Sequence, residues 1–257
     1  MKTYLLISFF SAILLPVWAQ GDLPYEARYF VNAAGDSLPY RILFPEGYEE
    51  PGQDYPLLLF LHGAGERGQD NESQLTHGAR TIADSISHYP AIVVFPQCKK
   101  EGYWAEIERT AEGFSYIFRE SPNPNLHLVM ALLDELLATE RVDTNRLYLG
   151  GLSMGGFGTF ELLARRPQTF AAAFPICGGG LPLLAPLYAP HVAMWIFHGA
   201  QDQVVPVAES REVYEALKQA GAAVKYTAYP EARHNSWDNA FAEPGLFNWL
   251  FSQRKTD

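Results

Sequence analysis

One serine in this chain has the surroundings of an activated nucleophile: Ser153, in the G-L-S-M-G segment 151–155. The segment follows an apolar stretch and opens a second apolar-periodic stretch that continues to Arg165. This pattern predicts a sharp turn from a strand into a helix. Such a turn strains the backbone at the serine and exposes its Oγ at a helix N-terminus, where N–H groups and the helix dipole favour negative charge. A side chain at Gly151 or Gly155 would collide with the neighbouring turn, which explains the glycines.

A nucleophilic serine needs a general base, and in sites built on this kind of turn the base follows the serine along the chain. Downstream of Ser153, His191 and His198 lie at the two ends of one predicted strand, whereas His234 lies in a loop after the last one. Loops at the carboxyl ends of strands often carry function. We therefore predict that His234 takes the proton from Ser153 and later passes it to the leaving group. The alternative is a histidine of an ordinary surface loop.

The base in turn needs a carboxylate that orients it. Asp202 lies in the loop after the preceding predicted strand, and we predict that it holds the His234 ring in its productive tautomer. Two alternatives are an aspartate that caps a turn or helix before Val207, and Asp238 as the acid. Asp238 lies on the wrong side of His234 for the expected chain order.

Stabilisation of an oxyanion requires two backbone N–H donors. The first is predicted at Met154, directly after the nucleophile, and the second in the glycine-rich loop 62–68 that follows an apolar strand. Ala64 is the predicted second donor, with its glycine neighbours at 63 and 65 as alternatives. His62 is predicted to anchor the loop rather than to act in catalysis. No G-K-[S/T] follows the loop, which argues against a phosphate cradle.

Eight apolar runs bounded by turn signals predict the strands that must position these residues. They are Arg28–Val31, Leu38–Phe44, Pro56–Leu61, Ala91–Phe95, Arg146–Gly150, Ala171–Ile176, His191–Phe197 and Val224–Tyr229. The first two, joined by a short Gly-Asp turn, predict an antiparallel hairpin.

Helical periodicity falls between most of the later runs. The predicted helices cover Leu126–Leu137, Gly156–Arg165, Val207–Ala220 and Trp237–Phe251. Strands that alternate with helices indicate crossover connections and a parallel sheet covered on both faces. The predicted fold class is therefore α/β, with an eight-stranded, mostly parallel sheet. The segment 178–190 is short, so no substantial cap is expected.

Composition narrows the class of protein. The chain has 257 residues, 48% of them hydrophobic, which supports a large core. Its net charge of −10 disfavours a nucleic-acid partner, because phosphate binding needs a basic surface. Apart from the N-terminal stretch discussed next, no apolar run approaches the ~20 residues of a membrane span. The seven histidines are scattered without a metal-ligand spacing, and no metal or cofactor is expected.

The N-terminus has the pattern of a signal peptide over residues 1–19: a basic start, an apolar core and the segment Val17-Trp18-Ala19. We expect cleavage after Ala19, export to the periplasm or the outside of the cell, and one domain over residues 20–257. The alternative is an uncleaved membrane anchor. Export would permit a disulfide between Cys98 and Cys177. The predicted sheet order places two strands between them, so two unpaired, buried thiols are favoured.

The turn at 151–155, called the elbow below, resembles that of the α/β-hydrolase superfamily. Together with the glycine loop, Asp202 and His234, it extends this resemblance over nearly the whole mature length. The segments Leu61–Gly68, Phe95–Cys98 and 151–156 resemble a secreted bacterial group labelled predicted peptidases, which is similar to feruloyl-esterase-like and depolymerase-like esterases. The resemblance implies a serine hydrolase of carboxylic esters that works through an acyl-enzyme. A peptidase of the prolyl-oligopeptidase type, an acyltransferase with the same triad, and a binding protein on a retired scaffold are the alternatives.

Two tryptophans are candidates for substrate contact. Trp104 lies in a long aromatic-rich connection, and Trp237 is close to His234 in sequence. Either could stack on an aromatic acyl group or a sugar; the alternative is that both pack loops onto the sheet. An open cleft would suit an aromatic or polysaccharide-linked ester.

Overall fold

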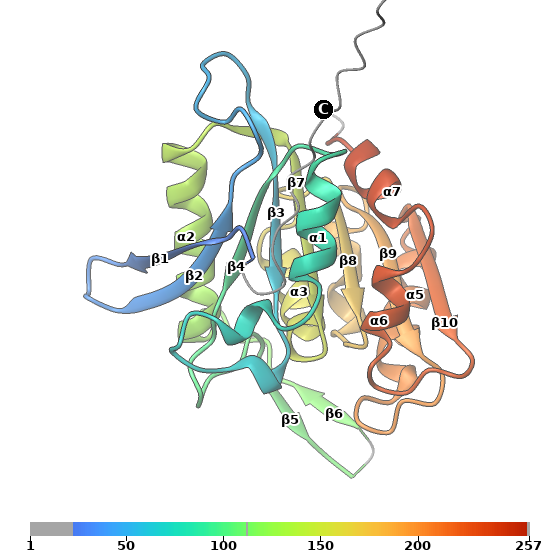
Figure 1. Cartoon of the computed structure of the whole chain (residues 1–257). Helices are drawn as coiled ribbons and strands as arrows, with labels where there is room; N and C mark the ends of the chain where they lie inside the picture. The colour runs from blue at the N-terminus through green and yellow to red at the C-terminus, as the bar shows by residue number, and fades with distance from the viewer. Residues whose placement is uncertain (1–22, 112, 256–257) are drawn as a thin grey trace, which may run out of the picture.

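The computed structural model describes residues 23–111 and 113–255. The predicted signal peptide lies outside this range. A single eight-stranded sheet runs through the molecule in the order β1-β2-β4-β3-β7-β8-β9-β10 (Figure 1). In chain order its strands are β1 (Glu26–Val31), β2 (Ser37–Leu43), β3 (Tyr55–Leu61), β4 (Ile92–Pro96), β7 (Val142–Leu152), β8 (Ala172–Ile176), β9 (Ala193–Gly199) and β10 (Val224–Tyr229). The eight predicted strands are thereby confirmed.

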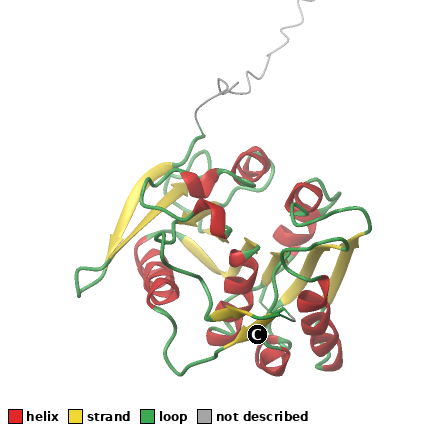
Figure 2. Cartoon of the chain, turned by 90° about the horizontal axis from the view of Figure 1, so that it is seen from below, coloured by secondary structure: helices red, strands yellow, loops and turns green. Residues whose placement is uncertain are grey.

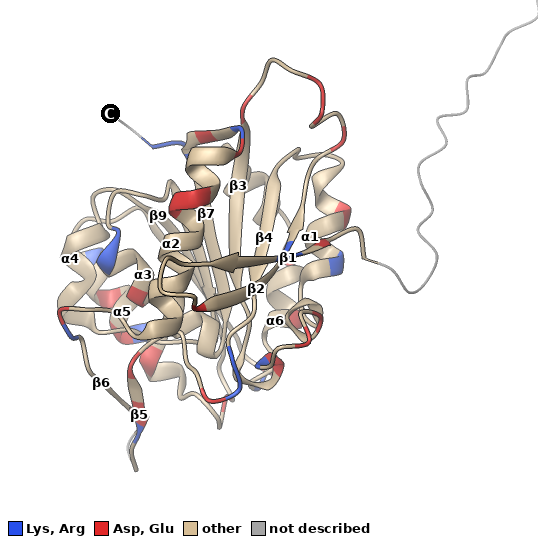
Figure 3. Ribbon diagram, turned by 90° about the vertical axis from the view of Figure 1, so that its left-hand side faces the viewer, with Lys and Arg blue, Asp and Glu red and all other residues tan. Residues whose placement is uncertain are grey.

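The sheet is parallel from β4 to β10, and the β1–β2 hairpin adds two antiparallel strands at one edge. All seven residues of β3 and all five of β4 are buried, and neither strand contains a charged residue. Figure 3 shows this arrangement: charged residues lie on helices and loops around uncharged central strands. Continuous apolar runs are what parallel strands covered on both faces require.

Helices cover both faces of the sheet, as Figure 2 shows from below. One face packs against α2 (Pro124–Thr139), α3 (Met154–Arg165), α4 (Ala185–Tyr188) and α5 (Val207–Gln219). The other packs against α1 (Ala79–Ile86), α6 (Trp237–Phe241) and α7 (Leu246–Ser252). Each helix buries its apolar side against a face of the sheet, and this packing is the main source of its stability. No helix among the described residues is long and apolar enough to span a membrane.

The structure differs from the sequence predictions in three places. The predicted helix Trp237–Phe251 is two helices, α6 and α7, because Gly245 adopts a positive φ of 83° between them. The segment before α2, predicted as a long connection, contains a small antiparallel sheet of β5 (Ile107–Arg109) and β6 (Phe114–Tyr116). Helix α1 had no counterpart in the predicted elements.

Two expectations about loops and thiols are confirmed. Between β8 and β9 there is only a short 3-10 turn and the four-residue α4, so no cap domain covers the sheet. Cys98 and Cys177 are free and buried. Burial raises the pKa of the Cys98 thiol to about 12.

Candidate active site

The turn between β7 and α3 has the predicted strained geometry. Ser153 joins the two elements with φ 52° and ψ −116°, in a region that residues other than glycine rarely adopt. A Cβ at Gly151 would collide with the carbonyl oxygen of Gly155, and a Cβ at Gly155 with that of Leu61. Both obstacles are backbone atoms, which cannot turn aside as a flexible side chain can. The glycines are therefore needed for close approach, as the sequence predicted.

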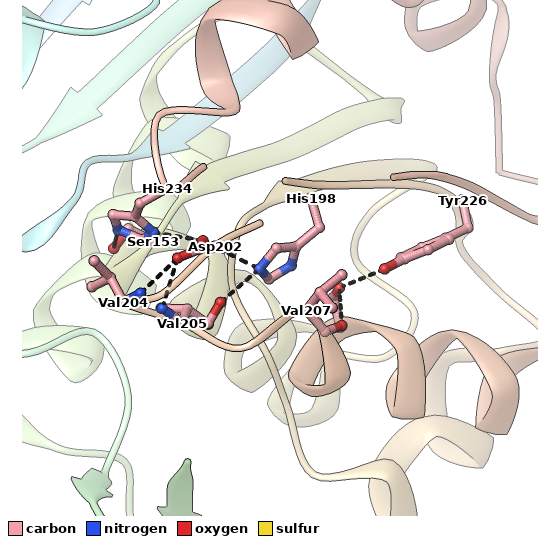
Figure 4. A network of polar contacts seen from close by, with 9 residues as sticks. Ser153, His198, Asp202, Val204, Val205, Val207, Tyr226 and His234 are labelled. Carbon is pink, nitrogen blue, oxygen red and sulfur yellow. Dashed lines mark hydrogen bonds and ion pairs between the residues drawn. The ribbon is translucent and has the colours of Figure 1, made fainter. Parts of the chain in front are cut away.

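The structure brings Ser153, His234 and Asp202 into one hydrogen-bonded row (Figure 4). Ser153 Oγ lies 2.9 Å from His234 Nε2, and His234 Nδ1 lies 2.7 Å from Asp202 Oδ2. The three residues come from the turn after β7, the loop after β10 and the loop after β9. These loops meet because parallel strands present their carboxyl ends at the same edge of the sheet.

The surroundings of Asp202 keep it ionised. Its side chain is fully buried, and Oδ1 accepts hydrogen bonds from the N–H groups of Val204 at 2.8 Å and Val205 at 3.0 Å. Burial alone would raise the pKa of Asp202. Hydrogen bonds from His198, His234, Val205 and Val204 outweigh it and hold the pKa well below its usual range. Asp202 therefore caps its own turn, as one alternative proposed, and also contacts His234.

The ionised carboxylate determines which nitrogen of His234 carries the proton. An ionised Asp202 only accepts hydrogen bonds, so Nδ1 of His234 must donate, and Nε2 is left to accept from the Ser153 hydroxyl. This tautomer is the one that a general base requires. Asp238, the other candidate acid, instead accepts a hydrogen bond from Asn235 Nδ2 at 3.1 Å.

The glycine loop lies directly beside the serine. A Cβ built on Gly63 would stand 3.6 Å from Ser153 Cβ. Within the described part of the chain, no protein acceptor bonds the backbone N–H of Ala64 or of Met154, which opens α3. Unpaired N–H groups are a general property of the first turn of a helix. Both predicted donors are therefore available to an oxyanion.

His62 anchors the glycine loop, as predicted. Its Nε2 accepts the N–H of Cys98 at 2.9 Å, and its Nδ1 lies 2.6 Å from the carbonyl oxygen of Gly63. Burial lowers the pKa of His62 to about 4, so the ring stays neutral near pH 7.

The prediction that Trp104 contacts the substrate is wrong. Its side chain is fully buried, and Nε1 donates a hydrogen bond to the carbonyl oxygen of His62 at 3.1 Å. The indole packs edge-on against the His62 ring, with centroids 5.2 Å apart. Trp104 therefore supports the glycine loop from within, because an aromatic ring with a satisfied N–H is most stable in the core.

Trp237 does lie at the site, partly exposed, with its ring centroid 5.5 Å from that of His234. It stands on the wall of an open groove of about 610 Å³. His77 shares the groove, with its ring centroid 4.9 Å from Trp237 and its Nε2 3.6 Å from a carboxylate oxygen of Glu66. The sequence did not single out His77 or Glu66, although Glu66 belongs to the glycine loop.

Among the described residues, one group has the spacing of metal ligands: atoms of Cys177, Asp202 and His234 lie within 4.8 Å of one another. Asp202 and His234 already contact each other. Burial raises the pKa of the Cys177 thiol, whereas metals bind the thiolate. The donor set therefore fits a proton-transfer row better than a metal centre.

The strand order and the strained serine between strand and helix define an α/β hydrolase. Within that superfamily the chain belongs to the phospholipase/carboxylesterase family, which matches residues 49–244.

Individual relatives agree with this family. The chain is 26% identical over 204 residues to an endo-1,4-beta-xylanase/feruloyl esterase of Xylanibacter ruminicola, covering 76% of this chain and 27% of that protein. It is 39% identical over 130 residues to poly(3-hydroxyalkanoate) depolymerase C of Paucimonas lemoignei, covering 48% of this chain and 28% of that protein. The crystal structure of a thermostable esterase superposes with a TM-score of 0.79 at 34% identity, covering 90% of this chain and 63% of that one. The chain thus spans about a quarter of these two curated relatives.

Proposed function

We propose that this protein is a secreted serine hydrolase that cleaves carboxylic esters through an acyl-enzyme. The observation that carries the proposal is the hydrogen-bonded row from Ser153 Oγ through His234 to Asp202, at 2.9 and 2.7 Å. Membership of the phospholipase/carboxylesterase family supports the ester as the bond that is cleaved.

The geometry supports the following reaction. Ser153 Oγ attacks the ester carbonyl while its proton passes to His234 Nε2, and the carbonyl oxygen becomes an oxyanion between the N–H groups of Met154 and Ala64. Collapse of this intermediate breaks the bond to the alcohol, which leaves with the proton from His234. Water then attacks the acyl-enzyme with His234 again as base, and releases the carboxylic acid and Ser153. Asp202 stays ionised throughout and stabilises the imidazolium.

The substrate class is a further part of the proposal. The Xylanibacter relative is named as a feruloyl esterase, and a Neocallimastix patriciarum relative as an acetylxylan esterase/xylanase. An open groove is lined by Trp237, whose ring contacts that of His234, and such a groove suits an aromatic or polysaccharide-linked ester.

Secretion rests on the sequence of residues 1–19, which precede the described structure. We propose cleavage after Ala19 and a single domain over residues 20–257. N-terminal sequencing of the exported protein tests this: a mature chain that begins at Gln20 supports it, and one that retains Met1 contradicts it.

Replacement of the nucleophile tests the activity. Ser153→Ala should reduce hydrolysis of p-nitrophenyl acetate by at least about 10⁴-fold, since the triad acts as a unit. Ser87→Ala, at an exposed position after α1, is the control and should keep full activity. Undiminished hydrolysis by Ser153→Ala would overturn the proposal. Faster cleavage of an aminoacyl amide than of the matching ester would favour the peptidase alternative, and acyl transfer to an added alcohol in preference to water would favour the acyltransferase.

A further inference from the structure

A second histidine contacts the triad carboxylate. His198 is the penultimate residue of β9, and its side chain is fully buried. Its Nε2 lies 3.0 Å from the carbonyl oxygen of Val205 and 3.4 Å from Oδ2 of Asp202 (Figure 4). The reaction described above does not use this residue.

These contacts determine where the His198 proton lies. Both neighbours of Nε2 are oxygens without a hydrogen, so the contacts are attractive only when Nε2 carries the N–H. The other ring nitrogen, Nδ1, is buried and has no hydrogen-bond partner among the described residues. All of the hydrogen bonding of the ring is thus directed to the loop that carries Asp202.

Asp202 is consequently held on both carboxylate oxygens. Oδ1 accepts the N–H groups of Val204 and Val205, while Oδ2 receives His234 and, more distantly, His198. Without His198, His234 would be the only side-chain donor to Oδ2 among the described residues, and it is the residue whose position Asp202 has to fix. His198 belongs to β9 and takes no part in the proton transfer, so it can hold the Asp202 carboxylate in one position during the reaction.

The bond from His198 to the Val205 carbonyl oxygen acts on the same loop. Val205 is 2% exposed and packs against Phe157, in the first turns of α3 after Ser153. The loop is therefore fixed at Asp202 and at Val205 by one imidazole, and its far side rests on the helix that carries the nucleophile.

We propose that His198 is a positioning residue, whose Nε2–H holds the Asp202 carboxylate in the orientation that aligns His234 with Ser153. This inference rests on the proposed function, because it concerns the alignment of that triad. His198 lies behind Asp202, away from the nucleophile, so its loss should slow the chemical step and leave substrate binding unchanged. A misplacement of the base by about 1 Å can cost on the order of 100-fold in rate.

Two substitutions test the role. His198→Met fills the space without a donor, and kcat for p-nitrophenyl acetate should fall by about tenfold to 100-fold with KM unchanged. His198→Gln places an amide N–H near the position of Nε2 and should recover most of the lost kcat. Two results would overturn the inference: a kcat of His198→Met equal to that of the wild type, or a kcat of His198→Gln as low as that of His198→Met at equal stability.

A measurement on the wild type keeps the inference testable if the variants fold poorly. ¹⁵N chemical shifts of the histidine rings show which nitrogen is protonated, with His198 assigned through its connection to the backbone resonances of the wild type. A proton on Nε2 supports the proposal, whereas a proton on Nδ1 removes the donor to Asp202 and overturns it. Ser153→Ala distinguishes a failure of this inference from a failure of the proposed function. If that variant stays active, the proposed function itself fails, whatever the His198 variants show.

Discussion

The hydroxyl of Tyr116 donates a 2.7 Å hydrogen bond to the carboxylate of Glu209, which ties the β5–β6 hairpin to the start of α5. Glu209 also accepts the backbone N–H of Phe114 at 3.0 Å. Burial and the neighbouring carboxylate raise the pKa of Tyr116, so its hydroxyl stays a donor. One acidic side chain thus attaches a hairpin that otherwise rests on a small apolar cluster.

The first prediction concerns this attachment. Tyr116→Phe should lower the free energy of unfolding by about 1 kcal/mol, because Glu209 loses one of its two donors. It should also speed proteolytic cleavage in the hairpin. Urea denaturation and limited trypsin digestion, which can cut after Arg109, measure these effects. Tyr103→Phe is the control, since it keeps the aromatic ring that faces Arg67 and should change neither quantity. Equal digestion rates for Tyr116→Phe and the wild type would show that the hydrogen bond does not hold the hairpin.

The second prediction concerns the elbow. Gly155→Ala should destabilise the fold by about 3 kcal/mol or more, because the new methyl group meets the backbone oxygen of Leu61. Gly65→Ala is the matched control: nothing lies within 4 Å of its added Cβ, so stability should stay within about 0.5 kcal/mol of the wild type. Urea denaturation measures both. A Gly155→Ala protein as stable as Gly65→Ala would mean that the turn opens more easily than its geometry indicates.

The third prediction is a pH dependence from His62. Its pKa falls from 6.5 to about 4 on folding, so the unfolded chain binds a proton that the folded chain does not between these values. The contribution of His62 to the free energy of unfolding should therefore be at its largest above pH 6.5. It should fall by up to about 3 kcal/mol as the pH decreases towards 4. Urea denaturation of wild type and His62→Gln across this range measures the difference, which should shrink towards acidic pH. The exposed His191→Asn is the control. A constant difference between wild type and His62→Gln would contradict the buried, neutral state of His62.

The fourth prediction separates the two tryptophans. Trp104→Phe should lower stability by about 1–3 kcal/mol, since it removes buried volume and the donor to His62. Trp237→Phe should hardly change stability but should raise KM for a feruloyl or sugar ester by about threefold to tenfold, with p-nitrophenyl acetate unaffected. Thermal unfolding and steady-state kinetics on both substrates check this. If Trp237→Phe raises KM for neither larger ester, the groove does not bind that part of the substrate.

The parts of the site that sequence could predict are those fixed by local geometry. Gly151 and Gly155 are required by the turn itself, and the order of Ser153, Asp202 and His234 follows from the order of the strands. The strands were predictable for the same reason: a run such as Tyr55–Leu61 is apolar throughout because both of its faces are covered.

The parts that escaped prediction depend on distant contacts. The β5–β6 hairpin is stabilised by Glu209, more than 90 residues away along the chain, and its own short strands have no clear periodicity. Trp104 was misplaced because nothing in the neighbouring sequence shows that it reaches the carbonyl of His62. The break between α6 and α7 did have a local signal in Pro244-Gly245, which the aromatic pattern on either side obscured.

The position of His234 has a consequence for the order of events during biosynthesis. The histidine follows β10, and β10 is held in place by its pairing with β9. A nascent chain emerges from its N-terminus, so Ser153 and Asp202 are made before their partner. Under the proposed function, a chain that ends before β10 lacks the base, so we expect hydrolysis only after the last strand has paired with β9. If the proposed function holds, measurable hydrolysis therefore reports that β10 is in place.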